Sequence, residues 1–318
     1  MRYNFLCLCM MLVPVYAQAG DLDVAIAHVR ASCIGISDEL NHLKTMAGIN
    51  TAVTGVGTVA GGVALGTGLA KANVDKQADE LFKRLREAAK KQGNISAIPV
   101  DGPVSYVDMN VAQLTVTASG DADADKKDKE KLDQLTKKSK TLGNIRTGTL
   151  AANTATNVAG TVIAATNMVK GDLQTQIDAC MASVDDLSAK YMQARVDNTA
   201  DSVELSIASK ITSECGLWST VDLSSINNRA KGAAISSGVG AGVGLVGTIT
   251  SALANSNKVR DDNSDAGMKK EKNLNTASNV LAGGATVASG VATVFNATQI
   301  NAIKKAAKVA DACEGALR

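Results

Sequence analysis

Residues 45–70 read TMAGINTAVTGVGTVAGGVALGTGLA and carry no charged side chain. Three later stretches share this composition, rich in Gly, Ala, Val and Thr: 147–169, 232–257 and 273–303. Each of the four is uncharged and is bounded at both ends by Lys or Arg. Apolar side chains recur in them at intervals of three and four residues, which predicts four long helices. The clearest apolar stripe, in the third stretch, consists of Ile235, Val239, Gly242, Val246, Ile249 and Leu253.

The high glycine content of these stretches indicates close packing between helices. Gly is about 1 kcal/mol less favourable than Ala in a helix, so a Gly-rich helix needs stabilisation from outside. Contact with another helix supplies it, because a missing side chain lets two backbones approach closely. We therefore expect helix packing at four pairs with the small-residue spacing GxxxG: Gly57/Gly61, Gly62/Gly66, Gly238/Gly242 and Gly240/Gly244.

The composition of the chain, which has 318 residues, departs from that of an ordinary globular protein. It is 45% hydrophobic but only 3% aromatic, whereas a conventional core of this size uses more Phe, Tyr and Trp. The formal net charge of +2 offers no basic surface for nucleic acid. We therefore expect no nucleic-acid partner.

The N-terminus predicts a secretory signal peptide over residues 1–19. Arg2 provides a positive start, residues 5–15 an apolar run, and the tripeptide AQA at 17–19 a cleavage motif. An uncleaved anchor helix is the alternative. We expect export of the mature chain, beginning near Gly20, to a compartment in which disulfides persist.

Amphipathic helices flank the uncharged stretches. Residues 26–43 carry apolar side chains at 3-4-3-4-3 spacing, the seam of a coiled coil, and this helix is expected to run directly into the first uncharged stretch. Residues 197–201 predict a linker. Both prolines of the mature chain lie in 93–120, where apolar residues alternate with Thr, so we expect a small β-like insert there.

The chain contains an internal repeat. The segment KKSKTL at 137–142 corresponds to KKEKNL at 269–274, and the tripeptide Asp-Ala-Cys ends at both Cys180 and Cys313. Each copy reads as a cysteine, a helix, an uncharged stretch, a charged tip, an uncharged stretch, a helix and a second cysteine. The predicted fold is mainly α, with two duplicated antiparallel helical hairpins of Gly/Ala-rich helices, each closed by a disulfide.

The first hairpin repeat is assigned to 20–196, including the insert 93–120, and the second to 197–318. Folding a hairpin antiparallel brings the two cysteines of one copy together at its open end. In the first copy the arms between cysteine and uncharged stretch have similar lengths, eleven and ten residues. Zinc fits poorly, because the cysteines are far apart in sequence and His is nearly absent. The expected disulfides are Cys33–Cys180 and Cys215–Cys313.

A lipid bilayer is the first partner that the sequence suggests. The uncharged runs have 23 to 31 residues, and about 20 suffice to cross a bilayer. Twenty Lys and Arg residues lie in the tips 71–146 and 258–272, against twelve near the cysteine ends, which favours cytoplasmic tips. Against this, Asn and Gln interrupt the second and fourth runs. The alternative is a soluble exported bundle with Thr and Asn on its wet faces.

No constellation of catalytic residues is apparent. His28 and His42 are the only histidines, both on the polar side of the opening helix, and no nucleophile has a plausible His partner. We therefore expect no enzyme, metal, cofactor or small-molecule substrate.

The expected function is that of an exported, membrane-associated, non-enzymatic structural or scaffold protein of the cell envelope. It would lie in the inner membrane with its cysteine ends in the periplasm, and associate with itself as a homo-oligomer or with an envelope protein. Two alternatives stay open. One is a secreted, membrane-active, pore-forming effector, and the other is a soluble periplasmic helical bundle that binds a protein partner.

Overall fold

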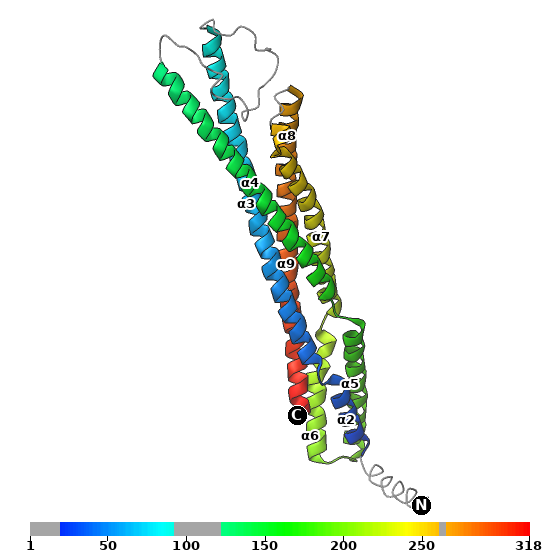
Figure 1. Ribbon diagram of the computed structural model, residues 1–318. Coiled ribbons are helices and arrows are strands. Elements are labelled where there is room, and N and C mark those ends of the chain that lie inside the picture. Colours follow the sequence, from blue (N-terminus) through cyan, green and yellow to red (C-terminus); the bar gives the residue numbers. More distant parts are fainter. Residues whose placement is uncertain (1–19, 92–121, 261–264) are drawn as a thin grey trace, which may run out of the picture. The chain divides into compact units, whose positions relative to one another are not determined.

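The computed structural model describes residues 20–91, 122–260 and 265–318, and every regular element within these ranges is helical. The mainly helical fold class is thereby confirmed. The predicted signal peptide 1–19 and the predicted insert 93–120 lie outside the described residues. The long helices in Figure 1 are α3 (Ile36–Lys91), α4 (Ala122–Thr166), α7 (Leu223–Ala254) and α9 (Asp265–Leu317). The shorter elements are α2 (Asp21–Cys33), α5 (Gly171–Asp197), α6 (Ser202–Cys215), the 3₁₀ helix η2 (Gly216–Thr220) and α8 (Asn257–Arg260).

The chain divides into two compact units. Unit 1 comprises the residues up to Ile49, together with Ala164–Lys231 and Phe295–Arg318. Unit 2 comprises Asn50–Ile163 and Gly232–Val294. The helices α3, α4, α7 and α9 contribute to both units, whereas α2, α5, α6 and η2 belong to unit 1 alone.

Unit 1 has an ordinary hydrophobic core. The short helices and the adjoining ends of the long helices pack around buried Ile, Leu, Val and Ala side chains. Trp218 of η2 lies in this core and is 2% exposed, and Leu40 and Ile177 are completely buried. Acidic residues such as Asp21 and Glu39 are exposed. Unit 1 thus has the polarity of a water-soluble helical protein, with apolar residues inside and charges outside.

The opening helix is interrupted, so the prediction of one continuous helix through residues 26–43 is wrong. Helix α2 ends at Cys33, and Gly35 adopts φ +95°, a left-handed conformation that glycine reaches without steric cost. Helix α3 then begins, and its first backbone N–H groups find a partner in α9: Glu314 Oε1 accepts from Gly35 N and Ser37 N, both at 3.1 Å. The acidic side chain satisfies donors that the first turn of a helix leaves unpaired.

Where the sequence predicts a linker over residues 197–201, a short connection joins α5 to α6. Helix α5 ends at Asp197, followed by Asn198 in the left-handed conformation. Helix α6 begins after Asp201, whose side chain accepts hydrogen bonds from Val203 N and Glu204 N, both at 2.8 Å. Glu204 Oε2 in turn accepts a hydrogen bond from Asp201 N at 3.3 Å, which completes a capping box and fixes where α6 begins.

Both predicted disulfides are confirmed. Cys33 at the end of α2 is bonded to Cys180 of α5, and the two Cα atoms are 4.8 Å apart. Cys215 at the end of α6 is bonded to Cys313 of α9, with a Cα–Cα distance of 4.4 Å. All four cysteines are at most 2% exposed and belong to the core of unit 1. The disulfides therefore link the short helices to the rest of this core.

Unit 2 is a bundle of the remaining parts of the four long helices, together with α8. Helix α4 lies against α3 and α7, because Gly160 of α4 approaches both Thr54 of α3 and Ser237 of α7. Helix α9 lies against α3 near Gly61 and against α7 near Gly284. Glycine lets helix axes approach closely at these places.

Candidate functional site: the polar interior of unit 2

Buried positions in unit 2 follow the helical repeat but are mostly small or polar. On α4 they recur at intervals of four and three residues from Arg146 onward. This buried stripe consists of Arg146, Leu150, Asn153, Asn157 and Gly160. On α3 the buried stripe consists of Asn50, Thr54, Gly57, Gly61, Ala64, Gly68 and Lys71. Such an interior differs from that of a water-soluble bundle, where Leu, Ile and Val fill the equivalent positions.

The outward surface of unit 2 is apolar. Within 50–70, 147–163, 232–254 and 277–294, every exposed residue is Gly, Ala, Val, Leu or Ile. We call this surface the apolar belt. Its larger side chains are Val56, Val59, Val63, Leu69, Val158, Val162, Ile235, Val239, Leu245, Val246, Ile249, Leu253, Val280, Val287, Val291 and Val294.

The apolar stripe that the sequence predicts on the third uncharged stretch faces outward along its whole length. All six of its members, from Ile235 to Leu253, are exposed. The soluble-bundle alternative places Thr and Asn on wet faces, whereas Asn153 and Asn157 are completely buried in unit 2. The helices thus turn their polar sides inward and their apolar sides outward.

An asparagine–serine cluster lies in the middle of this interior. Asn157 Nδ2 is 2.6 Å from Asn153 Oδ1 on the same helix and 2.8 Å from Ser289 Oγ on α9. Ser289 Oγ is also 2.9 Å from Asn153 Oδ1. Side chains of α4 and α9 therefore form hydrogen bonds with one another across the bundle, which reduces the cost of burying them.

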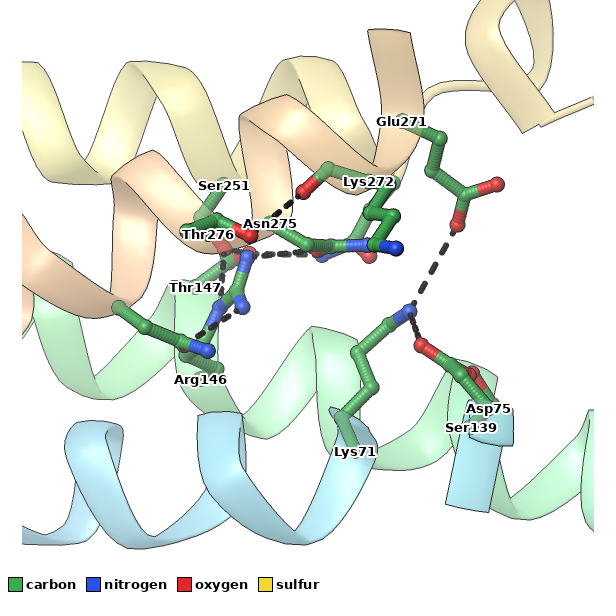
Figure 2. Close-up of polar contacts among 12 residues, drawn as sticks. Lys71, Asp75, Ser139, Arg146, Thr147, Ser251, Glu271, Lys272, Asn275 and Thr276 are labelled. Atoms are coloured by element: carbon green, nitrogen blue, oxygen red, sulfur yellow. Dashed lines mark hydrogen bonds and ion pairs between the residues drawn. The ribbon is translucent and has the colours of Figure 1, made fainter. Parts of the chain in front are cut away.

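The second polar cluster surrounds two buried cations, as Figure 2 shows. Arg146 is completely buried, and its guanidinium donates to three side chains. Nε bonds Ser251 Oγ of α7 at 3.0 Å, while Nη1 and Nη2 bond Asn279 Oδ1 and Asn275 Oδ1 of α9 at 3.0 and 3.1 Å. One side chain of α4 thereby holds two other helices, and its planar fork of donors suits this role.

Lys71 is the other buried cation and is 3% exposed. Its Nζ lies 2.7 Å from Asp75 Oδ2 on the next turn of α3 and 3.6 Å from Glu271 Oε1 on α9 (Figure 2). Asp75 also accepts a hydrogen bond from Ser139 Oγ of α4 at 2.5 Å. Lys71 directly follows the first uncharged stretch and Arg146 directly precedes the second. This charged cluster therefore marks one end of the apolar belt.

The predicted packing glycines occupy two different faces of their helices. A Cβ atom at Gly57 or Gly61 would lie 2.6 Å from Thr156 Oγ1 or 2.4 Å from Thr286 Oγ1, and one at Gly240 or Gly244 would approach Asn157 or Thr154 within 2.9 Å. The remaining four members of the predicted pairs are not in such contacts. A Cβ at Gly62, Gly66 or Gly242 would meet nothing within 4 Å, and one at Gly238 only Thr161, at 3.9 Å.

The two disulfides are neighbours in unit 1. The sulfur atoms of Cys33, Cys180 and Cys313 all lie within 4.8 Å of one another. Each of these sulfurs is bonded within a disulfide, so the group has no thiolate to offer a metal. His28 and His42 are both exposed on α2 and α3.

Sequence reasoning missed Arg146 and Lys71 as interior residues, treating them as the boundaries of the uncharged stretches. A signal was present: Arg146 lies four residues before Leu150 and seven before Asn153, in phase with the buried stripe of α4. Comparison with protein-family models, with curated proteins and with solved structures found no match to the chain.

By length and composition, three helical stretches in the described part of the chain could cross a membrane: Asp21–Leu85, Ser202–Ala254 and Lys269–Leu317. Helix α4 does not appear among them. Asn153 and Asn157 lower its mean hydropathy, and both face the interior of unit 2.

Proposed function

We propose that the protein is a membrane-embedded structural component of the cell envelope, with the apolar belt of unit 2 in the bilayer and unit 1 in water. The observation that carries this proposal is the reversed polarity of unit 2. Its exposed residues in the four stretches are all apolar or Gly, whereas its interior holds Asn, Ser, Thr, Lys71 and Arg146. Within a membrane, polar residues of helices face the bundle interior, where they bond one another.

The dimensions of the apolar belt suit a bilayer. The belt is carried by residues 50–70, 147–163, 232–254 and 277–294, which are 21, 17, 23 and 18 residues long. At a rise of 1.5 Å per residue they are about 25 to 35 Å long, and the hydrocarbon core of a bilayer is about 30 Å thick. In water the same surface would form an apolar patch far larger than soluble monomers expose.

A structural role fits better than an enzymatic one. The interior of unit 2 is filled by close helix contacts, since a Cβ at Gly61, Gly68 or Gly244 would come within 2.6 Å of a neighbouring side chain. A packed bundle in the bilayer can anchor a folded unit outside it. Unit 1, closed by two disulfides, would then present a stable surface in an oxidising compartment, to a second copy or to an envelope protein.

The topology of the proposal follows from charge and cysteine placement. Export by the predicted signal peptide would put the disulfide-bearing ends in the periplasm. The tips, which hold twenty of the Lys and Arg residues, would lie in the cytoplasm, in agreement with the positive-inside bias. The inner membrane is the proposed location.

The proposal includes the duplication of one hairpin unit. In both halves a short helix ends at a cysteine, Cys33 or Cys215, and a break of the helix follows before a long helix begins. In the first half the partner cysteine, Cys180, lies on α5, downstream of the returning helix α4, and in the second half Cys313 lies near the end of the returning helix α9. The halves differ in one respect: residues 167–170 interrupt the first return, whereas α9 is continuous.

A pore-forming effector is the second candidate, and one observation favours it. Asn153 Nδ2 and Ser237 Oγ are buried in unit 2 and have no hydrogen-bond partner among the described residues. Water entering the interior would satisfy both groups. A state of the bundle with a hydrated interior could therefore conduct.

The two candidates are separated by fractionation and by leakage. The full chain is expressed in a bacterium, and its envelope is extracted with alkaline carbonate. Retention in the membrane pellet, with no release of dye from liposomes that contain the purified protein, is the expected result. Release by carbonate would contradict the membrane proposal. Retention together with dye release would favour the pore.

A further inference from the structure

The two disulfides lie close enough in the core of unit 1 to exchange sulfur atoms. The sulfurs of Cys33, Cys180 and Cys313 are all within 4.8 Å of one another, although Cys313 is bonded to a fourth cysteine. A disulfide joins sulfur atoms about 2 Å apart, so the sulfur of Cys313 needs to approach either of the other two by at most about 3 Å. Cys215, the bonded partner of Cys313, does not belong to this close group. Cys313 is therefore placed to change partners, whereas Cys215 is not.

Hydrogen bonds hold the end of α2, where Cys33 lies, against the end of α9, where Cys313 lies. Three residues before Cys33, the guanidinium of Arg30 donates from Nε and Nη2 to the carbonyl oxygen of Leu317, at 3.0 and 2.7 Å. Leu317 follows Cys313 by four residues, so the contact is about one helical turn from each cysteine. The rigid fork of a guanidinium gives this contact a defined geometry.

A second contact lies on the other side of Cys33, where α3 begins. Glu314 Oε1 accepts from Gly35 N and Ser37 N, both at 3.1 Å, and the Ser37 hydroxyl donates to Asp311 Oδ1. Both acidic residues lie within two positions of the cysteine of α9. Contacts to α9 therefore occur before and after Cys33 along the chain. None of these hydrogen bonds involves a sulfur atom, so breaking a disulfide does not remove them.

We propose that the two disulfides of unit 1 form a thiol–disulfide exchange pair, with Cys33–Cys313 as the alternative bond. A dithiol first cleaves Cys215–Cys313; the dithiol is oxidised to its own disulfide, and the two cysteines become thiols. The Cys313 thiol loses its proton, and the thiolate attacks the sulfur of Cys33. The Cys33–Cys313 bond forms as the Cys33–Cys180 bond breaks, and Cys180 leaves as a thiolate that takes up a proton. This second step consumes no reductant.

The exchange changes which helices are linked by a disulfide. In the structure one disulfide joins α2 to α5 and the other joins α6 to α9. After exchange the bond joins α2 to α9, and α5 and α6 each carry a thiol, Cys180 and Cys215, in place of a disulfide. Reduction of the disulfide in one predicted repeat thereby opens the disulfide in the other. All four cysteines belong to unit 1, so the exchange does not depend on where unit 2 lies.

The test uses variants of the full chain in which one cysteine is already unpaired, so that no reductant is needed. In C215S the unpaired cysteine is Cys313, and in C180S it is Cys33. Each purified variant is held at about pH 8, where a sizeable fraction of an ordinary thiol is ionised. It is then quenched with acid, digested and mapped by mass spectrometry. Both variants should contain the same bond, Cys33–Cys313, although each starts from a different disulfide.

C313S is the matched control, because its unpaired cysteine is Cys215, which lies outside the close group. It should keep Cys33–Cys180. C215S should contain at least about tenfold more non-native linkage than C313S, because groups held close together react at a high effective molarity. Circular dichroism checks the fold of each variant. If C215S fails to fold, C180S carries the test, together with wild type treated with less than one equivalent of dithiothreitol, in which Cys33–Cys313 should also appear.

Absence of the Cys33–Cys313 bond from the folded variants would overturn the proposal. A bond between Cys180 and Cys313 in its place would overturn the attack on Cys33, and equal non-native linkage in C313S would show that proximity does not direct the exchange. The carbonate extraction of wild type tests the proposed function separately, since its result depends on unit 2 and not on the pairing of these cysteines.

Discussion

A lysine on the apolar belt distinguishes a lipid-facing surface from a water-facing one. Leu245 of α7 is 53% exposed and lies two residues from the midpoint of 232–254, about 3 Å along the helix axis. At the centre of a membrane helix Leu contributes about −0.3 to −0.6 kcal/mol to insertion and Lys costs about 2.5 to 3.5 kcal/mol. The substitution L245K should therefore disfavour insertion by about 3 to 4 kcal/mol, a factor of two to three orders of magnitude.

A soluble bundle would respond differently. Lys has nearly the helix propensity of Leu, and substitutions on a water-exposed surface change stability by about 0.5 kcal/mol or less. The matched control is I207K on α6 of unit 1, where Ile207 is 42% exposed. The membrane proposal and the soluble-bundle alternative both predict a small effect of I207K.

The assay is the fraction of protein that resists carbonate extraction, measured for wild type, L245K and I207K expressed at equal levels. We expect L245K to shift into the soluble or aggregated fraction and I207K to behave as wild type. The reasoning is refuted if L245K fractionates as wild type does and also unfolds at the same denaturant concentration.

Three further predictions follow from the packing, each checked by chemical unfolding of the purified protein. G61A should destabilise the bundle by about 1 to 2 kcal/mol, because its Cβ would lie 2.4 Å from Thr286 Oγ1. The neighbouring control G62A should be neutral or stabilising. Equal effects of the two substitutions would contradict the prediction that only Gly61 packs against another helix. R146M should lower the free energy of unfolding by about 2 to 4 kcal/mol, because three acceptors in the interior lose their donor. R146K should have an intermediate effect. An unchanged denaturation midpoint for R146M would contradict the buried cluster. The double variant C33S/C180S should lose about 5 kcal/mol by the loop-entropy relation for a separation of 147 residues, and unaltered stability would mean that the disulfide is not formed in the native protein.

The helices and the disulfide pairing could be predicted from the sequence because both depend on local spacing. Helical periodicity is visible over any two or three turns, and the similar arms around the first hairpin restricted the cysteine pairs. The break at Gly35 could not be predicted in this way. Cys33 and Ile36 keep the interval of three residues across the break, so the apolar seam hides the left-handed turn between them.

The direction in which each helix face points was harder to infer. Periodicity shows that a helix has two faces, but a Gly/Ala-rich helix does not show which of them is buried. The consecutive pairs Gly57/Gly61 and Gly62/Gly66 are alike in sequence, yet only the first meets neighbouring side chains. The buried asparagines mark the inner face in the structure, but the sequence alone does not show this. The partners that an interior Asn needs, such as Ser289, lie far away in sequence.

The most direct test of the membrane proposal is the depth of Leu245 in a bilayer. A nitroxide spin label is attached at L245C, and in a second sample at I207C, in full-length protein reconstituted into liposomes. Oxygen concentrates in the hydrocarbon core and a water-soluble nickel chelate is excluded from it. The proposal predicts that the label at position 245 is accessible to oxygen and protected from the chelate, with the reverse at position 207. Access of the chelate to both labels would contradict a belt that faces lipid.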